Sequence, residues 1–183
     1  MFTTEEILSA TKGVLAQGAG RQIYFPGVST DTRTIKRGEL FVAIKGSNFN
    51  GHDFIKIAQK RGCKGAVVSE NIRFSFPEDF VIIRVKDTTV ALGQIGNFHR
   101  KRFNIPVVAI TGSNGKTTTK EMLAFVLKKR FRVLSSVGTQ NNQIGVPQTL
   151  LKLKPIHEIA VLELGTNHFG EIGYLSKGCQ PTV

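Results

Sequence analysis

A glycine-rich segment, Thr111-Gly-Ser-Asn-Gly-Lys-Thr-Thr118, carries residue types that bind nucleotide phosphates. It begins at the end of an apolar run, residues 106–111, which reads as a buried parallel strand, and a segment with helical spacing of apolar residues follows it. Successive backbone amides between Gly112 and Gly115 can point into one concavity, toward which the positive end of the next helix is also directed. The sequence therefore predicts an anion cradle, and the expected nucleotide is ATP.

Two side chains at the end of this loop can complete a nucleotide site. Lys116 can neutralise the β- and γ-phosphates, and the Thr117 hydroxyl can ligate the Mg²⁺ that bridges them. The loop departs from the pattern G-x-x-x-x-G-K-[ST], because the first glycine of that pattern would fall at Ile110. The alternative interpretation is a strand-to-helix turn that binds nothing.

A second group of polar residues follows the very apolar run at residues 159–164. Glu163 lies near the end of this predicted strand, and open parallel sheets bind ligands outside the carboxyl ends of their strands. Glu163 can therefore share a Mg²⁺ ion with Thr117, or it can cap the next turn or pair with Lys116. His168 is either a ligand for metal or phosphate or a hydrogen-bonding residue of a polar loop.

Three further segments have weaker chemical patterns. Residues 141–147, Asn-Asn-Gln-Ile-Gly-Val-Pro, form a polar turn whose asparagines suit a nucleotide base, a substrate amide or an Asx turn. Residues 29–33 and 45–52 each follow a predicted strand and can line one edge of a sheet. Arg33 can bind a phosphate or a carboxylate in bidentate fashion, or it can form a structural turn with Asp31.

The elements of the first half predict a small α/β unit. Thr3 and Glu6 form a capping-box pattern for a short helix that ends near Gly13, a suitable C-cap. Apolar runs predict strands at residues 23–28, 40–44, 66–69 and 80–85, with a helix at about 53–60. Asp87 can cap the next helix, whose apolar stripe contains Ala91, Leu92, Ile95 and Phe98. We place the domain boundary after Val85.

The second half alternates strand and helix, which predicts a parallel sheet with helices on both faces. Pro106 opens the strand before the glycine-rich loop, and a helix with Met122, Leu123, Val126 and Leu127 at helical spacing runs to about Arg130. A strand near Val133, a connection rich in Gly and Asn, and the apolar strand at 159–164 follow. Domains of this type ordinarily contain more strands and helices, so we expect the end at Val183 to be a truncation.

The chain is strongly basic, with 25 Lys and Arg against 13 Asp and Glu, a formal net charge of +12. Such a charge suits nucleic acids and small polyanionic substrates. Most of the basic residues, however, fall in the last turns of predicted helices, where solvated cations complement the helix dipole. We therefore expect no nucleic-acid partner.

The cysteines and the N-terminus indicate a cytoplasmic protein. Cys63 and Cys179 are too few and too far apart for a disulfide framework or a metal knuckle, and either can be an inert core thiol. Glu5 and Glu6 stand where a signal peptide needs basic residues, and no apolar run is long enough to span a membrane. We expect no membrane insertion and a monomer.

Four segments together resemble signatures of the Mur ligase family, and their joint order is specific. They are S-T-D-T-R at 29–33 with G-E-L-F-V-A-I-K-G at 38–46 and N-G-H at 50–52; T-G-S-N-G-K-T-T at 111–118; N-N-Q-I-G-V-P at 141–147; and L-E-L-G-T-N-H-F-G-E-I at 162–172. The resemblance covers the whole chain.

The resemblance implies an α/β fold of two parts: a UDP-sugar-binding domain at residues 1–85 and an incomplete P-loop, parallel-sheet ATPase domain at 86–183. It implies Lys116 and Glu163 as catalytic residues and Thr117, Glu163 and His168 as Mg²⁺ ligands. The implied ATP-binding residues are Gly112, Ser113, Asn114, Gly115, Lys116, Thr117, Thr118 and Asn142, and the implied substrate-binding residues are Ser29, Asp31, Arg33, Asn50, Gly51 and His52. The family's carbamylated lysine, a further histidine and its C-terminal domain are absent from this chain, so we expect the chain alone to be inactive.

The implied activity is ATP-dependent peptide ligation in the synthesis of the cytoplasmic peptidoglycan precursor. A UDP-N-acetylmuramoyl-tripeptide is activated as an acyl phosphate, and the amine of D-alanyl-D-alanine then displaces phosphate. The alternatives are another Mur-type amino acid ligase and a fragment that only binds the UDP-sugar or the nucleotide. A basic nucleic-acid-binding ATPase is the rival from another class, and it predicts strongly salt-dependent binding to DNA or RNA.

Overall fold

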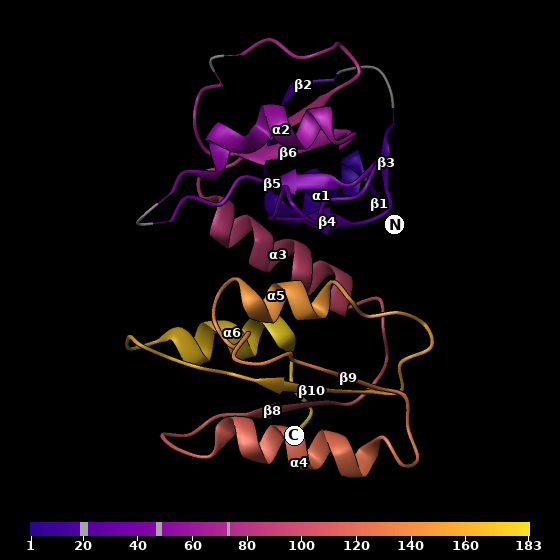
Figure 1. Ribbon diagram of the computed structural model, residues 1–183, viewed down its shortest axis with the longest axis vertical. Helices are drawn as coiled ribbons and strands as arrows, with labels where there is room; N and C mark the ends of the chain where they lie inside the picture. Colours follow the sequence, from indigo (N-terminus) through magenta and orange to yellow (C-terminus); the bar gives the residue numbers. More distant parts are fainter. Residues whose placement is uncertain (19–21, 47–48, 73) are drawn as a thin grey trace. The chain divides into compact units, whose positions relative to one another are not determined.

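The computed structural model describes residues 1–18, 22–46, 49–72 and 74–183. The chain divides into two compact units, Met1–Ala91 and Leu92–Val183 (Figure 1). This division falls within helix α3 (Thr88–Arg100), and the functional boundary after Val85 stays a prediction. Among the described residues, no helix is both long enough and apolar enough to cross a membrane.

The first unit begins with the predicted capped helix, α1 (Thr4–Thr11). The Thr3 hydroxyl accepts the Glu6 amide at 3.1 Å, and the Glu6 carboxylate accepts the Thr3 amide at 2.9 Å, so the capping box is confirmed. The prediction of Gly13 as C-cap is wrong, because the left-handed residue is Lys12, with φ 53°. A side chain at position 13 would lie 2.8 Å from the Ile83 Cγ2 atom, so glycine is needed there for close approach.

A five-stranded mixed sheet forms the centre of this unit, in the order β2-β7-β6-β5-β4. Parallel pairing joins β4 (Val28–Ser29), β5 (Leu40–Val42), β6 (Gly65–Val68) and β7 (Val81–Arg84). The sequence analysis missed β2 (Val14–Gln17), which pairs antiparallel with β7, and β1 (Phe2–Thr3), which pairs with β3 (Tyr24–Phe25). The single strand predicted at residues 23–28 is instead β3 and β4, separated by Pro26 and Gly27.

Helix α2 (Ile55–Lys60) and the 3₁₀ turn before it (Gly51–Phe54) cover one face of this sheet. The predicted helix at 53–60 is thus confirmed with a tighter first turn. The two buried residues of α2 pack with alternate residues of the strands in one apolar cluster, which contains Ile55, Ala58, Phe41, Ala66 and Ile82. Cys63 also lies in this cluster, where burial raises the pKa of its thiol to about 11, as fits an inert core cysteine.

The second unit has a three-stranded parallel sheet in the order β8-β10-β9, formed by β8 (Val107–Ile110), β9 (Val133–Ser135) and β10 (Ile159–Glu163). Helix α4 (Lys116–Leu127) lies on one face, and α5 (Gly145–Leu150) and α6 (Glu171–Cys179) lie on the other (Figure 1). The mixed α/β fold with parallel strands is thus confirmed. The strand before the loop was predicted to be buried, but only Val107 is; the rest of β8 is half-exposed.

Helix α3 begins as predicted, since the Asp87 carboxylate accepts the Thr89 and Val90 amides at 2.7 and 3.0 Å. Its end differs from the solvated basic terminus that the sequence suggested. The buried Arg100 guanidinium donates to the carbonyls of Phe103, Ile105, Cys179 and Gln180. Arg100 is therefore a structural cation that connects the end of α3 to the end of α6.

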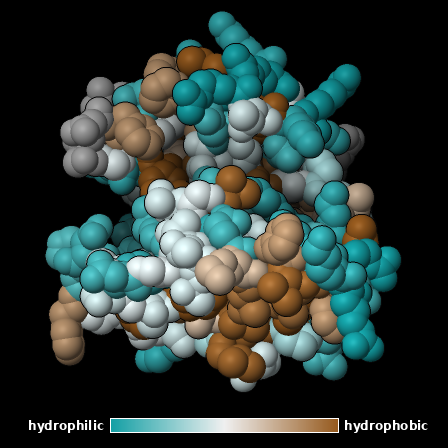
Figure 2. Space-filling view, turned by 60° about the horizontal axis from the view of Figure 1, so that its bottom comes forward, coloured by the Kyte–Doolittle hydropathy of each residue, from teal (hydrophilic) through white to brown (hydrophobic). Residues whose placement is uncertain are grey.

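The apolar stripe predicted on α4 is only partly correct. Leu123 and Leu127 are half-buried, whereas Met122 and Val126 are exposed, and the fully buried positions of this helix are Lys120 and Ala124. Figure 2 shows apolar surface where the outer side of α4 is turned forward. The helix therefore turns a lysine toward the sheet and leaves apolar side chains outside.

Candidate functional site

The glycine-rich loop connects the end of β8 to the first turn of α4. Gly112 and Gly115 have φ angles of 147° and 74°, in the left-handed region that favours glycine. A side chain added at Gly115 would meet nothing within 4 Å. These glycines are therefore needed for the path of the backbone and not for space.

The backbone amides of this loop stand out by their lack of acceptors among the described residues. In the part of the chain that the structure describes, none of the backbone amides from Ser113 to Thr118 donates a hydrogen bond to the protein, and the first bonded amide is that of Thr119, which donates to the Gly115 carbonyl at 2.9 Å. The unpaired amides stand at the positive end of α4. This arrangement is able to bind an anion.

The Lys116 ammonium lies over the loop. Its Nζ donates to the carbonyls of Gly112 at 2.7 Å and Ser113 at 3.3 Å. The alternative in which Lys116 pairs with Glu163 is not what the structure shows, because these two carbonyls are its recorded partners. The ammonium is exposed at the anion site, and its partners among the described residues are these two neutral carbonyls.

Glu163 ends β10 with a carboxylate that is 1% exposed. One oxygen accepts the Thr117 hydroxyl at 2.8 Å, and the other accepts the Asn141 side-chain amide at 2.8 Å. Its backbone amide donates to the Ser136 hydroxyl at 3.2 Å. The structure therefore brings the predicted pair Thr117 and Glu163 together, with Asn141 and Ser136 as partners that the sequence analysis did not identify.

The oxygen atoms of Thr117 and Glu163 fit a hard divalent cation. Mg²⁺ is commonly held by one or two protein oxygens, with water and phosphate oxygens at the remaining positions. Within the described ranges there is no group of three or more His, Cys, Asp and Glu residues that could hold a metal by itself. The donor set therefore suits a cation that arrives with phosphate.

His168 lies apart from this pair in the loop before α6. Its side chain is 82% exposed, and its Nδ1 lies 3.5 Å from a Glu171 carboxylate oxygen. Glu171 also accepts the amides of Asn167 and His168 at 2.7 and 3.0 Å, and these bonds lower the pKa of its carboxyl to about 2. The loop lines a hollow of about 420 Å³ with His168 and Phe169 on its wall. No hydrogen bond joins His168 to Thr117 or Glu163, so its role as a metal ligand stays a prediction.

The two neighbouring asparagines have different tasks. The Asn142 side-chain oxygen accepts the amides of Ile144 and Gly145 at 3.1 and 2.9 Å, so it forms an Asx turn and binds the first amide of α5. Asn141 instead reaches Glu163, and a side chain at Gly165 would lie 2.6 Å from the Asn141 Cγ atom. The role of Asn142 in ATP binding stays a prediction, and no sequence signal distinguishes the two residues.

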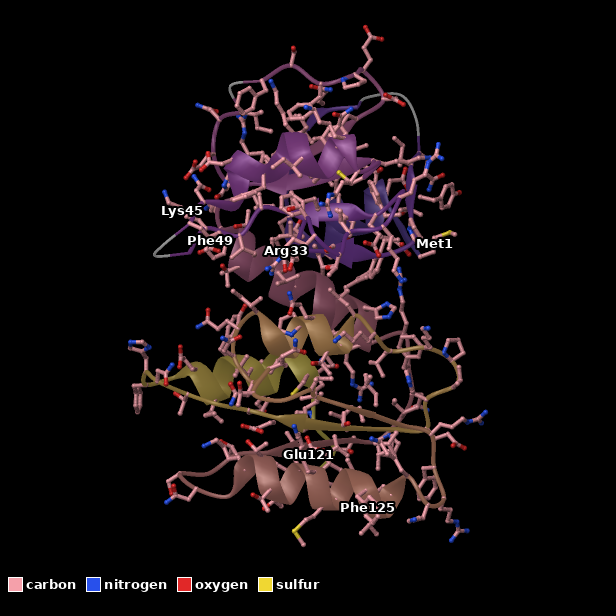
Figure 3. All side chains as sticks on the ribbon, in the orientation of Figure 1. Met1, Arg33, Lys45, Phe49, Glu121 and Phe125 are labelled. Atoms are coloured by element: carbon pink, nitrogen blue, oxygen red, sulfur yellow. The ribbon has the colours of Figure 1, made fainter. Side chains whose placement is uncertain are left out.

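In the first unit, residues 29–33 and 45–52 follow the adjacent parallel strands β4 and β5, as expected for one sheet edge. The Asp31 carboxylate accepts Arg33 through both Nε and Nη2, at 3.0 and 2.7 Å, and the Ser29 hydroxyl accepts the Asp31 amide. The hydrogen bond from the Arg33 side chain lowers the pKa of Asp31. The turn between Asp31 and Arg33 is formed, and the Arg33 side chain remains 85% exposed. Figure 3 labels this side chain.

Asn50 and His52 form a more buried network. The Ser69 amide donates to His52 Nε2 at 2.9 Å, so the neutral imidazole carries its proton on Nδ1, which contacts the Asn50 oxygen at 2.7 Å. Burial lowers the pKa of His52. The Asn50 amide donates to Glu70, which also binds Lys45 at 2.8 Å; the bond from Lys45 lowers the pKa of Glu70 to about 2.

Asn50, His52 and Glu70 line a hollow of about 460 Å³, together with Asn71, Ile72 and Phe74. Gly51 has a packing reason to be glycine, since a side chain there would lie 2.5 Å from the Ile44 carbonyl oxygen. The sequence analysis did not identify Glu70, whose position after β6 is the only local signal for it. Ser47 and Asn48 of the segment 45–52 lie outside the described residues.

Two family models match this chain. Residues 24–100 match "Mur ligase family, catalytic domain", and residues 110–183 match "Mur ligase middle domain". Together these ranges contain both groups of candidate residues.

Individual relatives agree with the family models. The chain is 38% identical over 179 residues to UDP-N-acetylmuramoyl-tripeptide–D-alanyl-D-alanine ligase of Bacillus subtilis, with 98% of this chain and 39% of the relative covered. It is 43% identical over 162 residues to the Escherichia coli protein of the same name, with 88% and 35% covered. The chain therefore spans less than two fifths of the length of these two relatives.

Solved structures show the same relationship. A crystal structure of MurF from Acinetobacter baumannii superposes with a TM-score of 0.87 at 39% identity and covers 98% of this chain and 39% of its own. The MurF ligase of Thermotoga maritima, solved in complex with ADP, gives a TM-score of 0.75 at 32% identity and covers 85% and 35%.

Proposed function

The chain belongs to the Mur ligase family, and we propose that it is the N-terminal part of an ATP-dependent ligase that joins D-alanyl-D-alanine to UDP-N-acetylmuramoyl-tripeptide. The proposed setting is synthesis of the peptidoglycan precursor in the cytoplasm, by a monomer without a nucleic-acid partner. The relatives that carry this name, each longer than this chain, support the assignment.

The observation that carries the nucleotide part of the proposal is the row of unpaired amides from Ser113 to Thr118 at the start of α4. A polyphosphate in this loop would accept hydrogen bonds that the protein itself leaves unmade. The Lys116 ammonium, now on two neutral carbonyls, would turn to the β- and γ-phosphate oxygens. The ADP complex of the Thermotoga maritima relative supports an adenine nucleotide as the ligand.

Thr117 and Glu163 would hold Mg²⁺ beside the phosphates. When bound, Mg²⁺ supplies positive charge that offsets charge on the phosphate oxygens. The Glu163 carboxylate is already oriented by Asn141, so the chain presents its oxygens in a fixed direction. Lys116 would stabilise charge on the transferred phosphoryl group, and this electrostatic preorganisation is the contribution of the chain to forming the acyl phosphate.

The first unit would bind the UDP-sugar. Exposed donors at one sheet edge, chiefly the guanidinium of Arg33, and the hollow beside Asn50 and His52 support this assignment. We assign UDP-sugar binding to residues 1–85 and ATP binding to residues 86–183. Lys116 and Glu163 are the proposed catalytic residues, and His168 is kept as a third ligand candidate.

Calorimetry with ATP and UDP-muramoyl-tripeptide, each added separately to the chain, tests the two binding assignments. We expect Lys116→Ala to abolish ATP binding and to leave UDP-muramoyl-tripeptide binding unchanged. Lys128→Ala, an exposed lysine beyond the end of the same helix, is the matched control and should bind both ligands normally. A folded Lys116→Ala chain that binds ATP as tightly as the wild type contradicts the nucleotide site.

The ligase activity is tested in the full-length protein that contains this chain. Phosphate release from ATP should require both UDP-muramoyl-tripeptide and D-alanyl-D-alanine, and it should be lost in Lys116→Ala. Release that needs another amino acid instead would favour a different Mur-type ligase. Tight DNA or RNA binding that weakens steeply with salt would favour the nucleic-acid ATPase.

A further inference from the structure

Lys120 is a fully buried lysine that the proposed mechanism does not use. It lies one turn after Thr117 on α4, and none of its surface is exposed, while Met122, Phe125 and Val126 of the same helix are 63–65% exposed. Figure 3 marks Phe125 on this helix. Burial of an ammonium group is strongly unfavourable unless the group is paired. A helix that buries lysine and exposes phenylalanine therefore needs a specific reason.

The Lys120 ammonium has an acceptor for each of its three protons. Its Nζ donates to the carbonyls of Ser136 at 2.9 Å and Gly138 at 3.0 Å, and it lies 2.8 Å from a carboxylate oxygen of Glu121. Ser136 and Gly138 lie in the segment that directly follows β9. Lys120 thus ties this segment to α4.

The segment that Lys120 holds is also the one that orients Glu163. The Ser136 hydroxyl accepts the Glu163 amide, and Asn141, three residues after Gly138, donates to one oxygen of the Glu163 carboxylate. The other oxygen accepts from Thr117, which lies on the same helix as Lys120. Glu163 is therefore held from two sides, by α4 and by residues 136–141, and Lys120 joins the two sides directly.

We propose that Lys120 is a positioning residue for the nucleotide and metal site, which fixes residues 136–141 to α4 so that Asn141 and Thr117 hold Glu163 in the direction of a bound cation. This inference rests on the proposed function, in which Thr117 and Glu163 hold Mg²⁺ beside ATP. Groups that orient metal ligands contribute to metal affinity without touching the metal. Among the described residues, the polar partners of the Lys120 ammonium are Ser136, Gly138 and Glu121, and not the loop amides or the Glu163 carboxylate.

The first test measures ATP affinity of the chain by calorimetry over a series of Mg²⁺ concentrations. Lys120→Met keeps the length of the buried side chain and removes the ammonium, and Lys128→Met is the matched exposed control. Without Mg²⁺, we expect Lys120→Met to bind ATP with wild-type affinity. We expect the variant to need at least about tenfold more Mg²⁺ than the wild type to reach the same increase in ATP affinity. An unchanged Mg²⁺ dependence would overturn the proposal.

A double-mutant comparison separates positioning from a general loss of stability. If Lys120 acts through Asn141, Lys120→Met should change the Mg²⁺ dependence by less than about twofold in an Asn141→Ala background. If the increases in Mg²⁺ requirement of the two single variants multiply in the double variant, Lys120 does not act through Asn141, and the proposed positioning role is overturned.

Hydrogen exchange gives a measurement that needs no nucleotide. The Ser136 amide donates to the Val161 carbonyl of β10, and the amides of Gln140 and Asn141 donate to carbonyls within the segment. All three should exchange faster in Lys120→Met, while the Ala160 amide, which donates to the Pro106 carbonyl, keeps its wild-type rate. Unchanged exchange at residues 136–141 would overturn the proposal. If Lys120→Met does not fold, Lys120→Gln takes its place with the same outcomes.

Failure of the proposed function gives a different result. A wild-type chain that binds no ATP at any Mg²⁺ concentration contradicts the nucleotide site itself. The exchange rates then still decide whether Lys120 holds residues 136–141.

Discussion

The Thr117 hydroxyl donates a 2.8 Å hydrogen bond to Glu163, which lies 46 residues further along the chain. The bond joins the first turn of α4 to the carboxyl end of β10. It places a hydroxyl and a carboxylate oxygen next to the loop whose amides are unpaired. The fold alone therefore brings this pair of oxygens together.

Replacement of Thr117 by valine tests this pair. Thr117→Val removes the hydroxyl and leaves one oxygen of the buried Glu163 without a partner, so we expect a loss of about 1–3 kcal/mol in the free energy of unfolding. We also expect at least about a tenfold higher Mg²⁺ requirement for tight ATP binding. Urea unfolding and calorimetry measure the two effects. Thr119→Val, exposed on the same helix, should change neither, and a normal Mg²⁺ response in Thr117→Val would contradict the assignment.

Gly165→Ala tests the position of Asn141. The added methyl group would lie 2.6 Å from the Asn141 Cγ atom, so Asn141 must move away from Glu163. We expect a loss of about 1–3 kcal/mol in the free energy of unfolding, as for other overpacked sites. Gly173→Ala is the control, because it adds a methyl group in open space within α6 and should stabilise the chain by about 0.5–1 kcal/mol. Changes of the same sign in both variants would show that crowding at Asn141 is not the cause.

The lowered pKa of His52 predicts that the chain loses stability in mild acid. Burial lowers its pKa in the folded state below the ordinary 6.5, so the unfolded chain binds a proton first as the pH falls. The contribution of His52 is fully present above pH 6.5 and is lost as the pH falls through the folded pKa, because a protonated Nε2 cannot accept the Ser69 amide. Urea unfolding at a series of pH values gives the free energy of unfolding as a function of pH. This free energy should change less steeply with pH in His52→Gln than in the wild type. Equal slopes would assign the pH dependence to other groups.

The lowered pKa of Glu171 predicts that its carboxylate titrates at a much lower pH, in the loop that carries His168. Its pKa of about 2, against 4.5 in an unfolded chain, arises from the Asn167 and His168 amides that it accepts. The bonds to the charged carboxylate are present above pH 4.5 and weaken as the pH falls toward about 2. Amide chemical shifts of Asn167 and His168 should follow this titration in the wild type and lack it in Glu171→Gln. A midpoint near 4.5 would mean that the bonds do not form in solution.

The sequence was sufficient to predict elements with strong local signals. The capping box at Thr3, the cap at Asp87 and the apolar strand β10 each rest on a pattern of a few neighbouring residues. Helix α5 was missed because the polar stretch 141–147 resembles a loop. The available signal for it was Asn142, a residue type that often accepts backbone amides at the start of a helix.

The site was predictable in part for a similar reason. Glu163 is the last residue of β10, and Thr117 follows the loop after β8; these two strands pair in parallel, so the topology alone brings the residues to the same edge. The buried Lys120 and the choice of Asn141 over Asn142 depend on contacts between segments far apart in sequence. The apolar pattern predicted on α4 did not point to Lys120, and two of its residues, Met122 and Val126, are exposed.

Because Lys120 is completely buried, the rate at which its amine reacts also reports local opening next to the nucleotide site. Amine-reactive reagents can modify exposed lysines such as Lys128 directly, whereas the Lys120 amine becomes reachable only when the segment after β9 parts from α4. Mass spectrometry can measure both acylation rates. Their ratio therefore reports how often the segment after β9 separates from α4 in the native ensemble.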